Sequence, residues 1–246
     1  MRATSGLTAL VLAVLASLGA SNQARAVAIP FAGGGFDFYD GPGGEITRSS
    51  LATIGVAGGA ASGAATIMRY DDSVVGDGDG FQGTVSVPVA EGPRVRAWGS
   101  RFVGQSDFRA WRAKAGVENP LISGSTLGLY YLFADDNHGD RTSGGAAELD
   151  VPMADELTGR ASAGLAAVTD GPASSQGSVG VAWRPTPGLE FSGDLGLTRN
   201  GSLTTSPGPG RALSLPLLGN GPPAGIPSID LRPERFVEVG MRVALP

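Results

Sequence analysis

The segment from Thr142 to Thr198 alternates apolar and polar side chains with a period of two. That period indicates β-strands whose two faces meet different surroundings. Charged residues such as Glu148 and Asp150 stand inside the strand-like runs and not only at their ends. The polar face therefore needs water or ion-pair partners. Strands that are apolar on one face and charged on the other are typical of a transmembrane β-barrel, with lipid outside and a polar lumen inside.

The same alternation recurs along most of the chain and predicts about twelve strands. We expect them near residues 36–39, 51–58, 63–70, 81–89, 95–103, 107–117 and 127–133, at four places within 142–198, and at 235–245. Val27–Phe31 is expected to be a short leader, and 71–80 and 135–141 to be polar loops. The predicted fold class is all-β, an antiparallel transmembrane β-barrel of about twelve strands. Ten strands is the alternative, if the first two runs lie outside the barrel.

The connections between these strands alternate in kind. The short ones fall at 91–93, 118–120, 154–155 and 185–188, and the intervening ones are often longer and more polar. The extreme case is Thr198–Pro233, which holds 7 of the 17 prolines and cannot be one continuous strand. We expect residues 199–233 to form a long Pro/Gly-rich loop. Outer-membrane barrels have short periplasmic turns and longer external loops, so both chain ends should lie on the periplasmic side.

The N-terminus has the pattern of a secretory signal peptide. Arg2 is followed by the apolar run Leu7–Leu18 and by the small-x-small sequence Ala24–Ala26. We expect a signal peptide at residues 1–26 and the barrel domain at 27–246, with cleavage after Ala28 as the alternative. Removing residues 1–26 leaves 16 basic and 23 acidic residues, a formal charge of −7. That charge argues against a nucleic-acid partner.

With this leader, the alternating runs and an amphipathic final run, the chain resembles bacterial outer-membrane β-barrel proteins from about Phe36 to Leu245. The resemblance implies location in the outer membrane, contact with outer-membrane lipid and lipopolysaccharide, insertion by the outer-membrane assembly machinery, and possible passage of small solutes. The alternative is a soluble periplasmic or secreted β-sandwich that acts as a binding module. Candidates for the aromatic girdles of a barrel are Trp98, Phe102, Phe108, Trp111, Phe133, Trp183 and Phe236.

Strand phase also predicts which charged side chains line the lumen. The candidates are Arg94, Arg96, Arg112, Lys114, Glu148, Asp150, Glu190, Asp194 and Glu238. The basic members fall on two neighbouring strands and the acidic members on later ones. Two arrangements remain open. Basic and acidic walls could face each other and act on solutes in a narrow channel, or the charges could pair and fill the interior of a structural barrel.

No motif predicts an enzyme, a cofactor or a metal site. GxSxG, HExxH and P-loop patterns do not occur. The single histidine, His138, stands in a polar segment, and an outer-membrane lipid hydrolase built on it is a third hypothesis. The acidic segments at 71–79 and 135–140 resemble solvated loops, because the position where a calcium loop would need its closing glutamate is Pro88.

Overall fold

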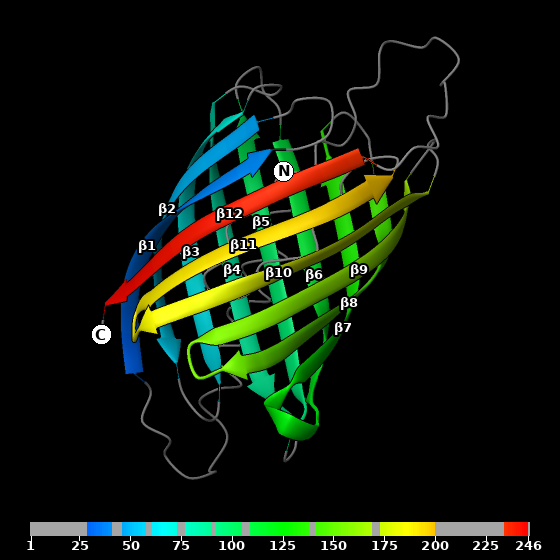
Figure 1. Cartoon of the computed structure of the whole chain (residues 1–246). Coiled ribbons are helices and arrows are strands. Elements are labelled where there is room, and N and C mark those ends of the chain that lie inside the picture. Colours follow the sequence, from blue (N-terminus) through cyan, green and yellow to red (C-terminus); the bar gives the residue numbers. More distant parts are fainter. Residues whose placement is uncertain are drawn as a thin grey trace.

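The structure, a computed structural model, describes residues 29–40, 46–57, 61–72, 77–89, 92–104, 109–137, 141–168, 173–199 and 234–245. These residues form twelve antiparallel strands that close into one barrel (Figure 1). The strands are β1 (Ile29–Asp40), β2 (Ile46–Ala57), β3 (Ser62–Asp72), β4 (Gly78–Pro88), β5 (Arg94–Gly104), β6 (Arg109–Pro120), β7 (Thr126–Asp136), β8 (Arg141–Ala154), β9 (Leu157–Val168), β10 (Ser174–Thr186), β11 (Leu189–Arg199) and β12 (Glu234–Leu245). A 3₁₀ turn, η3 (Ile122–Gly124), lies between β6 and β7.

Each strand pairs with its neighbours in the sequence, and β12 closes the barrel against β1. In Figure 1 the red β12 lies between the blue β1 and the yellow β11. Closure pairs every strand on both edges, which removes the unpaired backbone groups that lipid cannot satisfy. The predicted all-β barrel of twelve strands is therefore confirmed. The ten-strand count and the two-layer sandwich are both wrong for this chain.

Alternate positions of each strand differ in exposure. On β12 the side chains of Val237, Val239 and Met241 are 40–44% exposed, whereas Arg242 is 8% exposed. Large apolar side chains exposed at alternate positions form the outer surface of the barrel, where lipid would cover them. The intervening positions point inward. The outward face predicted for the last strand is observed.

The interior is filled unevenly. A cluster of Met68, Tyr70, Trp98, Phe102 and Ala110 is buried inside the wall formed by β3 to β6. The inward positions of β8 to β11 carry mostly small residues such as alanine, serine and glycine. Bulky side chains therefore occupy one side of the lumen and leave more room along the other.

The aromatic girdle prediction is partly wrong. Trp98, Phe102 and Phe236 are at most 4% exposed and point into the barrel. Their strand phase is that of the inward positions, so they pack inside and cannot anchor the barrel in lipid. Phe133 and Trp183 are 39% and 47% exposed on the outer surface, and the remaining outward candidate is Trp111. Phe108 lies outside the described residues.

Strand boundaries differ from the prediction at several places, and two of them lie near the N-terminal end of the barrel. The sequence predicts a leader at Val27–Phe31, but β1 begins at Ile29 and pairs with β2 over its whole length. It predicts a polar loop at 71–80, but β3 continues to Asp72 and β4 begins at Gly78. In both places backbone hydrogen bonds to two neighbouring strands override weak local strand signals.

The two ends of the barrel differ. At one end, here called the turn end, strands are joined by tight connections such as Ala154 to Leu157 and Thr186 to Leu189. Ile29 and Leu245, where the first and last strands begin and end, lie at this end too. The opposite end, here called the loop end, includes the connection from Arg199 to Glu234. The signal peptide at 1–26 and most of the loop at 199–233 lie outside the described residues, so both stay predictions.

In the part of the chain that the structure describes, no helix has the length and apolar character to cross a membrane.

Candidate functional site

The predicted lumen residues occupy inward positions of five strands. Arg94 and Arg96 lie on β5, Arg112 and Lys114 on β6, Glu148 and Asp150 on β8, Glu190 and Asp194 on β11, and Glu238 on β12. Their exposure varies widely. Lys114 is 3% exposed and Arg112 is 5% exposed, whereas the side chain of Asp150 is 57% exposed. These positions describe the geometry of the inner wall, and a role in lining a conducting lumen stays a proposal.

The densest group of charges, here called the lysine cluster, consists of Arg96, Lys114, Glu118, Tyr130 and Glu148. Lys114 forms an ion pair with Glu148, which lies two strands away on β8. Its Nζ also lies 3.9 Å from the centre of the Tyr130 ring. A cation that is held by a carboxylate and an aromatic face can remain inside a barrel at low solvent exposure. Lys114 is therefore anchored to the wall of the barrel.

The other half of the lysine cluster is built around the carboxylate of Glu118. Its Oε1 accepts a hydrogen bond from the Tyr130 hydroxyl at 2.6 Å and lies 2.5 Å from Nη1 of Arg96. The Tyr130 ring extends over Gly128, where an added Cβ would collide with the ring atoms. Glycine is needed at position 128 for this approach, so the backbone of β7 helps to set the position of the ring.

A second group of charges is centred on Glu190 of β11. Its two carboxylate oxygens contact Arg160 at 3.3 Å and Arg184 at 2.6 Å. Glu190 and Arg160 are 13% and 10% exposed, whereas Arg184 is 56% exposed at the turn end. One carboxylate thus neutralises two cations on β9 and β10.

Sequence reasoning missed several members of these groups. It assigns Glu118 to a turn, and it includes neither Tyr130 nor Arg160 among the lumen residues. The signal for finding them is strand phase, because Glu118 follows Lys114 by four positions and Arg160 precedes Ser162 by two. The basic candidates lie on β5 and β6 and the acidic candidates on β8, β11 and β12, but Glu118 shares β6 with Lys114, and Arg242 shares β12 with Glu238. Lys114 pairs with Glu148, and Glu190 pairs with Arg160, in both cases along the wall. These pairs agree better with an interior filled by paired charges than with a basic wall facing an acidic wall.

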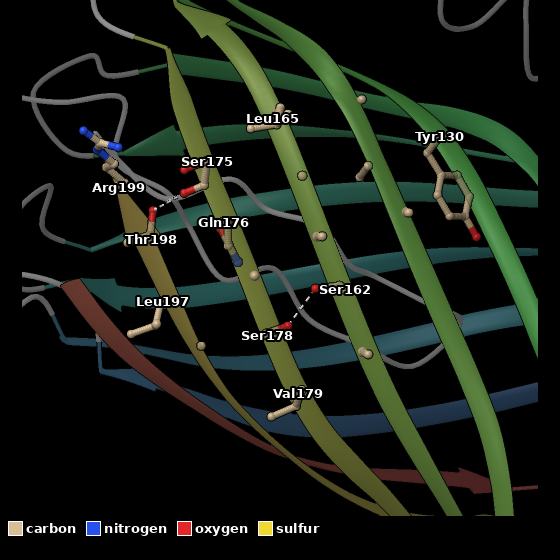
Figure 2. Close-up of a pocket in the computed structure, with 18 of the residues that line it drawn as sticks. Tyr130, Ser162, Leu165, Ser175, Gln176, Ser178, Val179, Leu197, Thr198 and Arg199 are labelled. Atoms are coloured by element: carbon tan, nitrogen blue, oxygen red, sulfur yellow. Dashed lines mark hydrogen bonds between the residues drawn. The ribbon is translucent and has the colours of Figure 1, made fainter. Parts of the chain in front are cut away.

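A cavity of about 1680 Å³ borders the strands from β7 to β12 (Figure 2). Its inward lining is polar and small. Ser162 and Ser178 share a hydrogen bond of 2.7 Å, and the Thr198 hydroxyl donates to the Ser175 carbonyl at 3.4 Å. The cavity thus borders the wall of small residues and not the wall that carries the aromatic cluster of β3 to β6.

Side chains of the outer face also contribute to the lining of this hollow. They include Leu165, Val179, Leu197, Arg199 and Arg235. The exposure of the leucine and valine side chains and of both arginines places this part of the hollow on the outer surface of the barrel.

The structure offers no assembled site for a metal ion among the described residues, where no group of three or more His, Asp or Glu side chains converges. The acidic residues Asp71 and Asp79 lie on neighbouring strands, and Asp135 forms an ion pair with Arg141 at 3.4 Å. His138, on which the hydrolase hypothesis depends, lies outside the described residues.

Comparison with known proteins supports the fold. No family model and no curated protein matches the chain. Among solved structures it is similar to the KdgM porin in complex with disordered oligogalacturonate, with a TM-score of 0.57, 10% identity, and coverage of 88% of this chain and 99% of that one. The comparison with the NanC porin gives a TM-score of 0.56 and 9% identity, and it covers 88% of this chain and 100% of that one. The comparison with an outer-membrane channel from Pseudomonas putida F1 gives a TM-score of 0.56 and 8% identity, and it covers 92% of this chain and 99% of that one. The chain therefore has the fold of outer-membrane porins and channels, as the sequence predicted.

Proposed function

We propose that the protein is a narrow outer-membrane channel through which small polar solutes diffuse. The observation that carries the proposal is the uneven interior of the barrel. Aromatic side chains fill the wall of β3 to β6, while the inward positions of β8 to β11 carry mostly small side chains. Twelve strands stand between eight-stranded barrels, which side chains fill, and sixteen-stranded porins, which hold open water. The path for solutes runs along β8 to β11, past Ser162, Gln176 and Ser178.

The charged residues suggest how such a channel treats ions. Lys114 is paired with Glu148, Glu190 with Arg160 and Arg184, and Arg96 with Glu118. Paired charges cancel at distances longer than their separation, so they create a weak net field in the lumen. The channel is therefore expected to pass small solutes with little preference for either sign of charge. Contact with the outer-membrane assembly machinery stays a prediction from the resemblance.

The test is single-channel conductance of the purified full chain in planar bilayers. Wild-type protein should give small, discrete conductance steps, with a reversal potential close to zero in a salt gradient. Lys114→Gln removes the cation opposite Glu148 and leaves a carboxylate that attracts cations. We expect this variant to shift the reversal potential toward cation selectivity.

Arg48→Gln is the matched control, because it also removes one positive charge but from an exposed outward position of β2. It should leave selectivity unchanged. A folded protein that produces no conductance would identify a sealed structural barrel and contradict the channel. Equal shifts in the two variants would show that overall charge, and not the lysine cluster, sets selectivity.

A further inference from the structure

The outward charged residues of the strands gather at one end of the barrel. In the described strands every outward Arg or Asp lies within a few residues of the loop end, and none lies near the turn end. They are Arg48, Arg69, Arg101, Arg109, Arg141, Arg199 and Arg235, together with Asp40, Asp71, Asp79 and Asp135. At the turn end the outward positions carry no charge and are mostly apolar, with residues such as Val95, Val117, Val151 and Trp183. The outer surface thus has a basic rim at the loop end only.

Part of this rim is neutralised within the protein. Asp71 is opposite Arg48 in the pairing of β2 with β3, and Asp79 is opposite Arg69 in the pairing of β3 with β4. Arg141 contacts Asp135 at 3.4 Å. These arginines have carboxylates of the same chain beside them, so their attraction for an external anion is weaker.

Arg199 and Arg235 differ from those pairs. Ser175 is opposite Arg199, and Leu197 is opposite Arg235. Arg199 and Arg235 therefore lie on adjacent strands, two positions apart in register, and both point outward. The outward acid nearest to them in register is Asp40 of β1, which is opposite Val237. Among the described strand residues, the two guanidinium groups thus share at most one neighbouring outward carboxylate at this part of the rim.

The surface below the two arginines is apolar. Leu165, Val179, Leu195 and Leu197 are 69%, 62%, 55% and 48% exposed on the outer face of β9 to β11. Leu197 and Arg199 lie close together on β11 (Figure 2). All of these side chains and both arginines border the same hollow. Hydrocarbon chains can therefore lie against the leucines while an anionic headgroup sits at the arginines.

We propose that Arg199 and Arg235 bind a phosphate of lipopolysaccharide in the outer leaflet, with the lipid's acyl chains packed on Leu165, Val179 and Leu197. Guanidinium groups match phosphate oxygens with two parallel hydrogen bonds, and two of them on adjacent strands can contact one phosphate group. The position at the loop end fits this partner, because the longer connections of such barrels face the outside of the cell. The inference is independent of solute passage.

The test is binding of purified lipopolysaccharide to the detergent-solubilised full chain, followed by native mass spectrometry or by titration. We expect Arg199→Ala combined with Arg235→Ala to weaken binding by about tenfold or more, since hydrogen bonds to charged groups are individually strong. The matched control is Arg48→Ala combined with Arg69→Ala, which removes the same number of rim arginines. It should change the affinity by less than about twofold, because both have aspartates opposite. Heat-modifiable gel mobility confirms that each variant is folded.

Three further measurements separate the alternatives. Dephosphorylated lipopolysaccharide should bind the wild type as weakly as intact lipopolysaccharide binds the variant that has lost both arginines. Arg199→Lys with Arg235→Lys should recover part of the affinity, because lysine keeps the charge but loses the bidentate geometry. If the test and control variants lose the same affinity for lipopolysaccharide, binding depends on overall surface charge and not on Arg199 and Arg235, and the proposal is overturned. Equal or tighter binding of phosphatidylglycerol would overturn the assignment to lipopolysaccharide.

Discussion

Arg242 of β12 and Asp37 of β1 form an ion pair across the seam where the first and last strands close the barrel. Nη1 of Arg242 lies 2.5 Å from Oδ1 of Asp37, and Nη2 donates to Oδ2 at 2.7 Å. Nη1 also donates to the carbonyl of Phe36 at 3.2 Å. The two residues are 205 positions apart in the sequence, so this contact forms only when the whole chain has been wrapped into the barrel.

Arg242→Ala should weaken barrel closure. The substitution leaves the carboxylate of Asp37 buried without its main partner, which typically costs about 3–5 kcal/mol. We expect a lower urea midpoint for unfolding in detergent and a lower temperature for the shift in gel mobility. Arg141→Ala is the control, because its pair with Asp135 is more exposed and lies between neighbouring strands of the sequence. It should cost no more than about 1 kcal/mol.

The exchanged variant, Asp37→Arg with Arg242→Asp, tests whether the ion pair itself is responsible. It should regain part of the lost stability, because the opposite charges again meet at the seam. Recovery will be incomplete, since the hydrogen bond to the Phe36 carbonyl needs a donor on β12. If Arg242→Ala and Arg141→Ala cost the same, the seam contact has no special role in closure.

Gly128→Ala should disturb the lysine cluster without changing any charged residue. The added Cβ would collide with the Tyr130 ring, so the ring must move away from Glu118 and Lys114. Overpacking of this kind costs about 1–3 kcal/mol. Gly83→Ala is the control, because nothing lies within 4 Å of a Cβ at that position. Urea unfolding of both variants provides the comparison.

A double-mutant cycle identifies the cause of that loss. If the clash with the ring is responsible, Gly128→Ala should cost much less in a Tyr130→Ala background than in the wild type. An unchanged cost in that background would assign the effect to the backbone of β7 and leave the ring without a role.

Glu190→Gln should change ion selectivity in the direction opposite to Lys114→Gln. Glu190 contacts Arg160 and Arg184 at once, so its neutralisation leaves two guanidinium groups with reduced compensation. We expect the reversal potential to shift toward anions. The same electrophysiological recording checks both variants, and Ser178→Ala serves as a neutral inward control on β10. Shifts of the same sign in Glu190→Gln and Lys114→Gln would contradict an electrostatic origin.

Strand phase can be predicted wherever charged residues alternate with β-branched or aromatic ones. On β12, Glu238 and Arg242 mark the inward phase, and Val239 and Met241 mark the outward one, so the prediction for that strand is correct. On β5 the same logic applies to Arg94 and Arg96, whose phase continues through Trp98, Ser100 and Phe102. The girdle prediction follows side-chain chemistry and ignores this phase, and for that reason it places Trp98 and Phe102 in lipid.

Partners across the barrel could not be predicted from the sequence. The pairing of Lys114 with Glu148 depends on the register of three strands and on how far the lysine side chain extends along the wall. The glycines in the middle of β1 pose a similar problem, because locally they argue against a strand. Gly35 lies beneath the side chain of Arg242, where an added Cβ would meet the arginine at 2.8 Å. Only the closed barrel explains why a small residue is needed there.

Tryptophan fluorescence can test the inward and outward assignments directly. Three variants, each keeping one of Trp98, Trp111 or Trp183 and replacing the other two with phenylalanine, are reconstituted in bilayers with brominated acyl chains. Trp183 is 47% exposed on the outer face and stacks on Phe191 with ring centres 5.7 Å apart, so lipid-borne bromine should quench it strongly. Trp98 is 4% exposed and points inward, so its emission should be quenched far less. Arg94 and Arg96 share the strand phase of Trp98, so strong quenching of Trp98 would indicate that both arginines face lipid. That outcome would show that the inward and outward faces of β5 are assigned the wrong way round, and the lumen would then lack the two arginines of β5.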